Sequence, residues 1–130
     1  MFLSHTAVSV KSLEKTRKFY EDVFGLEFKA EGAHPEMDIK FVFLKDPRNG
    51  QMLEIFEHIK PINENKNPMD FQKVGYIHIG FIVDNIEETL KLALEKGAKI
   101  ISPAKEGVTV KKYAFISDPN GLPVELTEIL

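Results

Sequence analysis

Two stretches of the chain repeat one another, and this repeat limits the folds that the chain can adopt. Residues 43–55 and 115–126 each read as an apolar strand, a turn containing Asp-Pro and Asn-Gly, and a second short strand with one glutamate between two aliphatic residues. Proline fixes φ, and Asn-Gly tolerates the positive φ that a tight connection between antiparallel strands needs. A hairpin that recurs in the sequence predicts a fold that recurs in space.

The repeat extends over nearly the whole chain. Matched residues lie 71 to 73 positions apart, and they include His5 with His78, Gly25 with Gly97, and Glu54 with Glu125. We expect one domain, residues 1–130, made of half-modules 1–57 and 74–130 that are joined by a linker at 58–73. Each half has an apolar sheet face that it cannot cover alone, so the halves must pack together or against another chain.

The hydrophobic pattern predicts the same order of elements in both halves, strand–helix–strand–strand–strand. The first helix follows Ser12 and is ended by Gly25, and the second follows Asn85 and is ended by Gly97. Strands are predicted at 2–10, 26–31, 39–44 and 51–57, and again at 75–83, 99–102, 110–117 and 122–127. Residues 32–38 and 103–109 are predicted to be loops, and a turn of helix is predicted near 69–71.

Four side chains with metal-binding chemistry stand at matched places: His5 and Glu54 in the first half, His78 and Glu125 in the second. Two imidazoles and two carboxylates suit Zn, Ni, Co, Mn or Fe(II), and four protein ligands can leave positions for water or substrate. Taken alone, a strand histidine is more often an ordinary hydrogen-bonded residue, and a strand glutamate usually faces solvent. Because both residue types recur at matched places, the pattern favours a single metal site.

Other polar residues have simpler explanations. We expect His34, in a polar loop, and His58, at the start of the linker, to be exposed and without a ligand role. The segment 111–113 (Lys-Lys-Tyr) could bind an acidic substrate group, but a solvated strand end explains it better. Ser9 and Phe43 share a strand face with the four candidate ligands by parity, which core packing explains equally well.

Composition excludes several classes of function. The chain has no cysteine, which excludes disulfides, thiolate metal sites and a cysteine nucleophile. Its formal net charge is −3 with no block of like charges, so neither nucleic acid nor an anionic membrane is expected as the main partner. We find no signal-peptide pattern and no apolar run of membrane-spanning length. These features are typical of a cytoplasmic enzyme that acts on a small-molecule substrate.

The sequence resembles the vicinal oxygen chelate superfamily, and within it glyoxalase I most closely. The resemblance rests on Leu-Ser-His-Thr at 3–6, the Phe-Tyr…Gly-Leu segment at 19–26, Leu-Glu-Ile at 53–55, His-Ile-Gly-Phe at 78–81, and the Asp-Pro-Asn-Gly to Val-Glu-Leu segment at 118–126. It implies an α+β fold in which two tandem βαβββ modules form a cup-shaped, open β-barrel around one metal, and it implies paired barrels, hence a homodimer.

The same resemblance implies roles for individual residues. His5, Glu54, His78 and Glu125 match the four ligand positions of glyoxalase I, which isomerises the hemithioacetal of methylglyoxal and glutathione to lactoylglutathione. It implies one divalent ion (Ni, Co, Zn or Mn), with Glu125 as the proton-moving base and Glu54 able to share that role. Ser9 stands where bacterial glyoxalases carry a basic residue that helps hold a glutathione carboxylate, so the thiol of the substrate is left open.

Other functions within this superfamily remain alternatives. A methylmalonyl-CoA epimerase is favoured by Pro61-Ile62…Phe71 in the linker, but that family has glutamine at the place of Glu54 and histidine at the place of Ile77. A dioxygenase needs only two histidines and one carboxylate, so Glu54 counts against it. Fosfomycin-type thiol transfer uses three ligands and a basic pocket. A bleomycin-sequestering protein or a purely structural module would leave the matched quartet unexplained.

Overall fold

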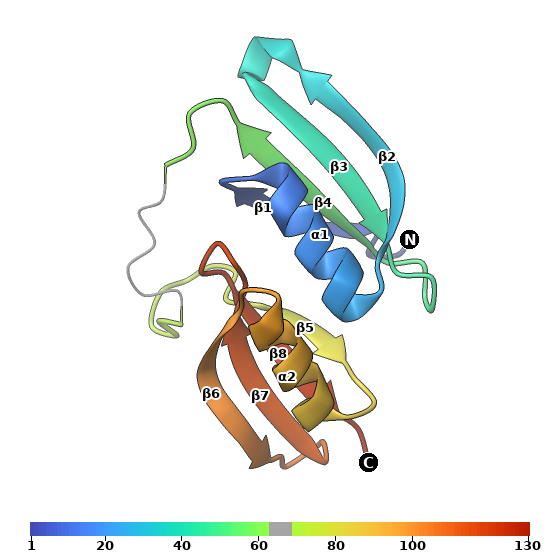
Figure 1. Cartoon of the computed structure of the whole chain (residues 1–130), viewed down its shortest axis with the longest axis vertical. Coiled ribbons are helices and arrows are strands. Elements are labelled where there is room, and N and C mark those ends of the chain that lie inside the picture. Colours follow the sequence, from blue (N-terminus) through green and yellow to red (C-terminus); the bar gives the residue numbers. More distant parts are fainter. Residues whose placement is uncertain (63–68) are drawn as a thin grey trace. The chain divides into compact units, whose positions relative to one another are not determined.

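Two units of the same construction make up the chain in the computed structural model, Met1–Glu64 and Asn65–Leu130. The structure describes residues 1–62 and 69–130. Each unit contains one four-stranded sheet and one α-helix in the order strand–helix–strand–strand–strand (Figure 1). The prediction of an α+β fold with two tandem βαβββ modules is therefore confirmed.

The first unit has the strand order β1-β4-β3-β2. β1 runs parallel to β4, and the other neighbours are antiparallel. Its elements are β1 (His5–Val10), α1 (Leu13–Phe24), β2 (Glu27–His34), a 3-10 turn η1 (Pro35–Met37), β3 (Ile39–Lys45) and β4 (Met52–His58).

The second unit repeats this topology with the strand order β5-β8-β7-β6. Here β5 runs parallel to β8, and the other two neighbouring pairs are again antiparallel. Its elements are β5 (Ile79–Ile82), α2 (Ile86–Glu95), β6 (Lys99–Glu106), β7 (Lys112–Ser117) and β8 (Pro123–Glu128).

Both helices begin at the predicted caps. The Ser12 hydroxyl accepts a hydrogen bond from the Lys15 N–H, and the Asn85 amide oxygen accepts one from the Glu88 N–H. Each cap satisfies an N–H that the first helical turn would otherwise leave without a partner. Gly25 ends α1 in the left-handed conformation with φ of 67°, which a residue with a Cβ adopts at a cost.

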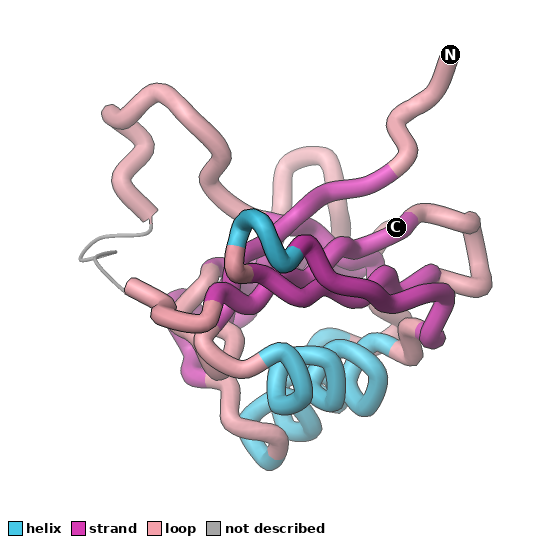
Figure 2. Tube along the Cα trace, turned by 90° about the horizontal axis from the view of Figure 1, so that it is seen from above, coloured by secondary structure: helices cyan, strands magenta, loops and turns pink. Residues whose placement is uncertain are grey.

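In each unit the helix covers one face of the sheet, and the core lies between them (Figure 2). Alternate residues of the central strands are buried there, as a period of two requires. In the first unit they are Val42, Leu44, Leu53 and Ile55, which lie on the same side as Phe19 and Tyr20 of α1; in the second they are Ala114, Ile116, Val124 and Leu126, with Ile86, Leu90 and Ala93 of α2. Within the described residues, the other face of each sheet carries no helix of its own unit.

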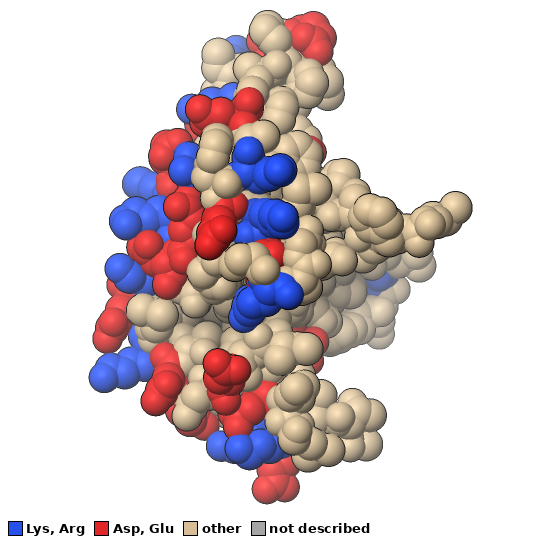
Figure 3. Space-filling model, turned by 90° about the vertical axis from the view of Figure 1, so that its right-hand side faces the viewer, with Lys and Arg blue, Asp and Glu red and all other residues tan. Residues whose placement is uncertain are grey.

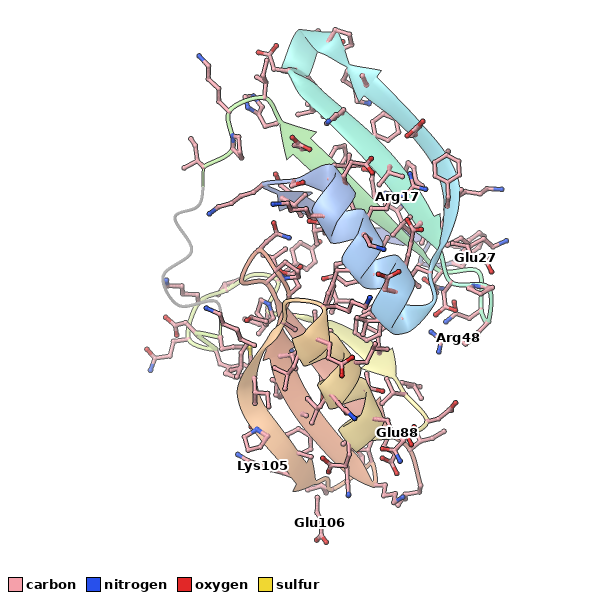
Figure 4. All side chains as sticks on the ribbon, viewed as in Figure 1. Arg17, Glu27, Arg48, Glu88, Lys105 and Glu106 are labelled. Atoms are coloured by element: carbon pink, nitrogen blue, oxygen red, sulfur yellow. The ribbon has the colours of Figure 1, made fainter. Side chains whose placement is uncertain are left out.

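The two predicted hairpin turns are present and are held by buried aspartates. The Asp118 carboxylate accepts hydrogen bonds from the N–H groups of Asn120 and Leu122, at 2.8 and 3.0 Å. Asp46 accepts from the Arg48 N–H at 3.0 Å and from its guanidinium. The Arg48 guanidinium also lies 3.5 Å from the carbonyl oxygen of Phe24 at the end of α1 (Figure 4).

Several local predictions were wrong at the ends of elements, including the strand starts at 2–4 and 110–111, which the structure does not contain. Residues 32–34 and 103–106 belong to strands β2 and β6 and not to loops, because hydrogen bonds to β3 and β7 extend these strands past Gly32 and Pro103. Residues 75–78 precede β5, which begins only at Ile79. Residues 69–71 form no helix; Asp70 instead accepts backbone hydrogen bonds from Gln72 and Lys73.

Basic and acidic side chains are interspersed on the face drawn in Figure 3, with no large area of one sign. Within residues 1–62 and 69–130, none of the helices has the length and apolar character needed to cross a membrane.

Candidate functional site

Strand register places the candidate histidine and glutamate of each unit on one sheet face. In the first unit, Ala7 lies opposite Glu54, so the histidine is two residues before the partner of the glutamate. In the second unit, Gly80 lies opposite Glu125, and His78 is again two residues earlier. Because side chains two residues apart on a strand point to the same side, His5 and Glu54 share a face. His78 stands directly before β5, and the contact of its Nε2 with Oε2 of Glu125 places these two side chains on one side of the sheet.

That face is the one that the helix of the same unit does not cover, and we call it the open face. Its defining residues are His5, Phe43 and Glu54 in the first unit and His78, Phe115 and Glu125 in the second. Phe43 is the strand partner of Glu54, and its ring meets the ring of His5 edge-on at 5.4 Å between centroids. Phe115 has the same relation to Glu125 and His78, at 5.1 Å.

Hydrogen bonds orient both histidines. In the second unit, Nε2 of His78 lies 2.9 Å from Oε2 of Glu125, and these side chains are 26% and 27% exposed. In the first unit, Nδ1 of His5 lies 2.7 Å from the Ser4 hydroxyl. A partner on one ring nitrogen fixes the ring and directs the other nitrogen, as is common for histidines that bind metals. Both pairs can therefore be reached by solvent, a metal ion or a small substrate.

Each unit contains two of the four candidate donor side chains. Among the described residues, no group of three or more His, Asp or Glu side chains is placed to hold a metal ion. Divalent transition metals in proteins commonly take at least three protein ligands. Each pair taken alone therefore has fewer donors than such a site uses.

The other polar residues considered from sequence make local contacts. His34 is exposed as expected and stacks on Phe41 at 5.1 Å between centroids, whereas His58 is only half-exposed and accepts a hydrogen bond from the Lys60 N–H. Lys111 is paired with Glu128. Ser9 lies opposite Phe56 in the register of β1 and β4, which gives the open face of the first unit an uncharged side chain at this place.

Sequence reasoning missed a second pair of matched glutamates, Glu57 and Glu128, each three residues after a candidate ligand. Glu57 Oε2 accepts a hydrogen bond from the N–H of Leu13, the first residue of α1, at 2.7 Å. Glu128 Oε2 accepts one from the N–H of Ile86, the first residue of α2, at 3.1 Å. Their spacing of 71 residues equals that of Glu54 and Glu125, a signal that was present in the sequence.

The electrostatic environment of Glu128 favours its charged form. The hydrogen bond from Lys111, followed by that from the Ile86 N–H, lowers the pKa of the Glu128 carboxyl below its ordinary value. A carboxylate at the first turn is also stabilised by the partial positive charge of the helix N-terminus.

Comparison with known proteins identifies the class of this fold. The model of the Glyoxalase/Bleomycin resistance protein/Dioxygenase superfamily matches residues 2–126. A probable lactoylglutathione lyase of Synechocystis sp. is 30% identical, over 98% of this chain and 95% of that protein. A crystal structure of a glyoxalase family protein from Enterococcus faecalis has a TM-score of 0.78 at 30% identity, covering 98% and 97% of the two chains.

A more distant structure supports the fold alone. A mutant of the fosfomycin resistance protein FosX from Listeria monocytogenes, in complex with Mn(II) and a dihydroxypropylphosphonic acid, has a TM-score of 0.70 at 21% identity. The match covers 99% of this chain and 93% of that one. One scaffold can therefore carry different reactions, so the reaction must be argued from the site.

Proposed function

The chain belongs to the Glyoxalase/Bleomycin resistance protein/Dioxygenase superfamily, and on this premise we propose that it is a divalent-metal-dependent lyase or isomerase of the glyoxalase I type. Its substrate would be an α-hydroxycarbonyl adduct of a thiol, as for a lactoylglutathione lyase. The observation that carries the proposal is the equal placement of one histidine and one glutamate on the open face of both units. Relatives named lactoylglutathione lyase support it.

The four donors fit a divalent transition metal. His5, Glu54, His78 and Glu125 would hold one ion of Ni, Co, Zn or Mn, because imidazole nitrogen and carboxylate oxygen suit these metals and neither open-face pair is fully buried. When bound, such an ion supplies Lewis-acid stabilisation of the negative charge that develops on the substrate oxygens.

Glu125 is proposed as the base. Its carboxylate is about one-quarter exposed and is held by His78, so a substrate can reach it while its position stays defined. It would take the proton from the carbon that bears the thiol and hydroxyl groups and return it to the neighbouring carbon, which becomes the hydroxyl-bearing carbon of the product. Glu54 has the matching place in the first unit and can share this role.

Two further parts of the proposal concern the thiol and the assembly. Ser9 gives the open face no cation for a substrate carboxylate at this place, so thiols other than glutathione belong in the substrate test. We also propose a cytoplasmic homodimer; sedimentation showing a monomer at micromolar concentration would contradict the dimer.

The direct test is metal loading followed by a substrate panel. Protein stripped with a chelator is reloaded with Ni, Co, Zn or Mn and assayed with methylglyoxal hemithioacetals of glutathione and of uncharged thiols. We expect activity with at least one metal and its loss on chelation. Oxygen consumption, or activity only on a coenzyme A ester, would assign the chain to a different member reaction of the superfamily.

The base is tested by Glu125→Gln. This variant should keep most of its bound metal and lose turnover by about a hundredfold or more, the usual contribution of a general base. Glu106→Gln is the matched control, because Glu106 ends β6 and points away from the sheet (Figure 4). Normal turnover by Glu125→Gln would restrict Glu125 to a ligand role and place the base elsewhere.

A further inference from the structure

The second pair of matched glutamates, Glu57 and Glu128, lies on the strands that carry the candidate ligands. Glu57 is three residues after Glu54 on β4, and Glu128 is three residues after Glu125 on β8. Because side chains an odd number of residues apart point to opposite faces, each strand carries a ligand on its open face and a second carboxylate on the face towards the helix. The hydrogen bonds to Leu13 and to Ile86 agree with this orientation.

Each of these carboxylates joins its own strand to the start of the helix in its unit. The first helical N–H donates to it, so it is bound to the start of the helix. The helix start follows β1, which contains His5, in the first unit, and β5, which begins directly after His78, in the second. The carboxylate therefore ties the start of the helix, and with it the helix end of the preceding strand, to the strand that bears the glutamate ligand.

A lysine completes the arrangement in both units. Lys40 Nζ lies 3.7 Å from Oε2 of Glu57, and Lys111 Nζ contacts Oε1 of Glu128. These lysines are themselves 71 residues apart, the same spacing as the glutamates. The carboxylates are 24% and 12% exposed, and hydrogen bonds that involve charged groups are roughly twice as strong as neutral ones.

We propose that Glu57 and Glu128 are positioning residues of the candidate metal site, each holding the histidine and glutamate of its own unit in register. This inference rests on the proposed function, because the groups that Glu57 and Glu128 would position are the proposed metal ligands. Neither carboxylate touches the substrate; each acts through the strand that it anchors. The helix caps and the sheet hydrogen bonds act within one element or between neighbouring strands. Glu57 and Glu128 instead connect the start of a helix to the strand that bears the glutamate ligand.

The test compares Glu57→Ala, Glu128→Ala and the double variant with Glu106→Ala as control. The metal-free readout is the pair of ring contacts on the open faces, measured as nuclear Overhauser effects. Glu57→Ala should weaken the His5–Phe43 contact and leave His78–Phe115 unchanged, and Glu128→Ala should do the reverse. Glu57→Gln and Glu128→Gln, which keep an oxygen acceptor for the helix N–H, should fall between wild type and alanine, and they serve if an alanine variant does not fold.

The second readout is binding of Co(II) alone, followed by calorimetry and by its visible absorption bands, which report ligand geometry. Each alanine variant should bind about tenfold more weakly, in line with the effect of residues that orient metal ligands. If the ring contacts and the Co(II) bands remain as in wild type while thermal stability falls, the residues only stabilise the fold and the proposal is overturned. If wild type binds no Co(II) but the ring contacts respond as expected, the positioning role stands and the proposed metal function fails.

Discussion

Replacing Asp118 by alanine should destabilise the protein more than the same replacement at Asp46, although the two aspartates occupy matched turns. Asp118 is 2% exposed and its carboxylate accepts two backbone hydrogen bonds, from Asn120 and Leu122. Asp46 accepts one backbone hydrogen bond, and its other partner is the guanidinium of Arg48, whose side chain is 56% exposed.

The expected magnitudes follow from these partners. A hydrogen bond that involves a charged group contributes about 1.5–3 kcal/mol, and in Asp118→Ala the two N–H groups lose their acceptor together. Both belong to half-exposed residues, so water replaces part of the loss, and we expect a cost of about 2–3 kcal/mol. Asp46→Ala removes one such bond, again partly replaced by water, and an ion pair whose Arg48 side chain is 56% exposed and which is therefore worth roughly 0–1 kcal/mol, so about 1–2 kcal/mol is expected.

Urea unfolding followed by circular dichroism measures both variants against wild type. Asp118→Asn is the control that keeps an oxygen acceptor for both N–H groups, and it should cost about 1 kcal/mol. For a chain of this size each kcal/mol lowers the melting temperature by about 4 °C, so Asp118→Ala should melt about 8–12 °C below wild type. If Asp118→Ala costs no more than Asp46→Ala, the turn is held by its backbone alone and this reasoning fails.

Two further predictions concern pH and helix capping. The hydrogen bond from the Arg48 side chain lowers the pKa of the Asp46 carboxyl in the folded protein. The stabilisation of the fold by this pair is therefore complete above the ordinary aspartate pKa, and it is lost as pH falls through the lower pKa of the folded state. The difference in unfolding free energy between wild type and Arg48→Met should therefore shrink on acidification from pH 6 to about pH 3, and a constant difference would contradict the assignment. Ser12→Ala and Asn85→Ala should each cost about 1 kcal/mol in urea unfolding, because each removes a side-chain acceptor at a helix start; an unchanged midpoint would show that water replaces the cap.

Local signals predicted the helices and the hairpins well. Ser12, Asn85 and Gly25 act within one turn of their own position, so their chemistry alone sets where the helices begin and where α1 ends. Asp-Pro and Asn-Gly likewise fix a turn whose hydrogen bonds lie inside the same few residues. Repetition then placed the same elements in the second unit without further information.

The extent of the outer strands could not be read from local pattern. Gly32 and Pro103 resemble loop residues, yet β2 and β6 continue through them, because an outer strand is held by hydrogen bonds to a neighbour distant in sequence. Register shifts occur in both outer strands, at Phe28/Ala30 and at Ile100/Ser102, and such irregularities blur a period of two. The contacts of Glu57 and Glu128 were missed for a related reason, because the N–H groups that donate to them belong to a helix distant in the sequence.

The two open faces have their candidate ligands at matched strand positions, but they differ at their outer strands. Phe41 lies opposite Gly32, whereas Tyr113, which matches Phe41 in the repeat, lies opposite Lys105. A Cβ at position 32 would come within 2.8 Å of the Phe41 ring, so the first unit cannot accept the side chain that the second unit carries without moving that ring. The chain therefore presents its two donor pairs beside outer strands that differ, with glycine at position 32 in one unit and lysine at the matched position 105 in the other. The surroundings of Glu54 and Glu125 therefore differ in shape at the outer strand, although the two strand positions are the same.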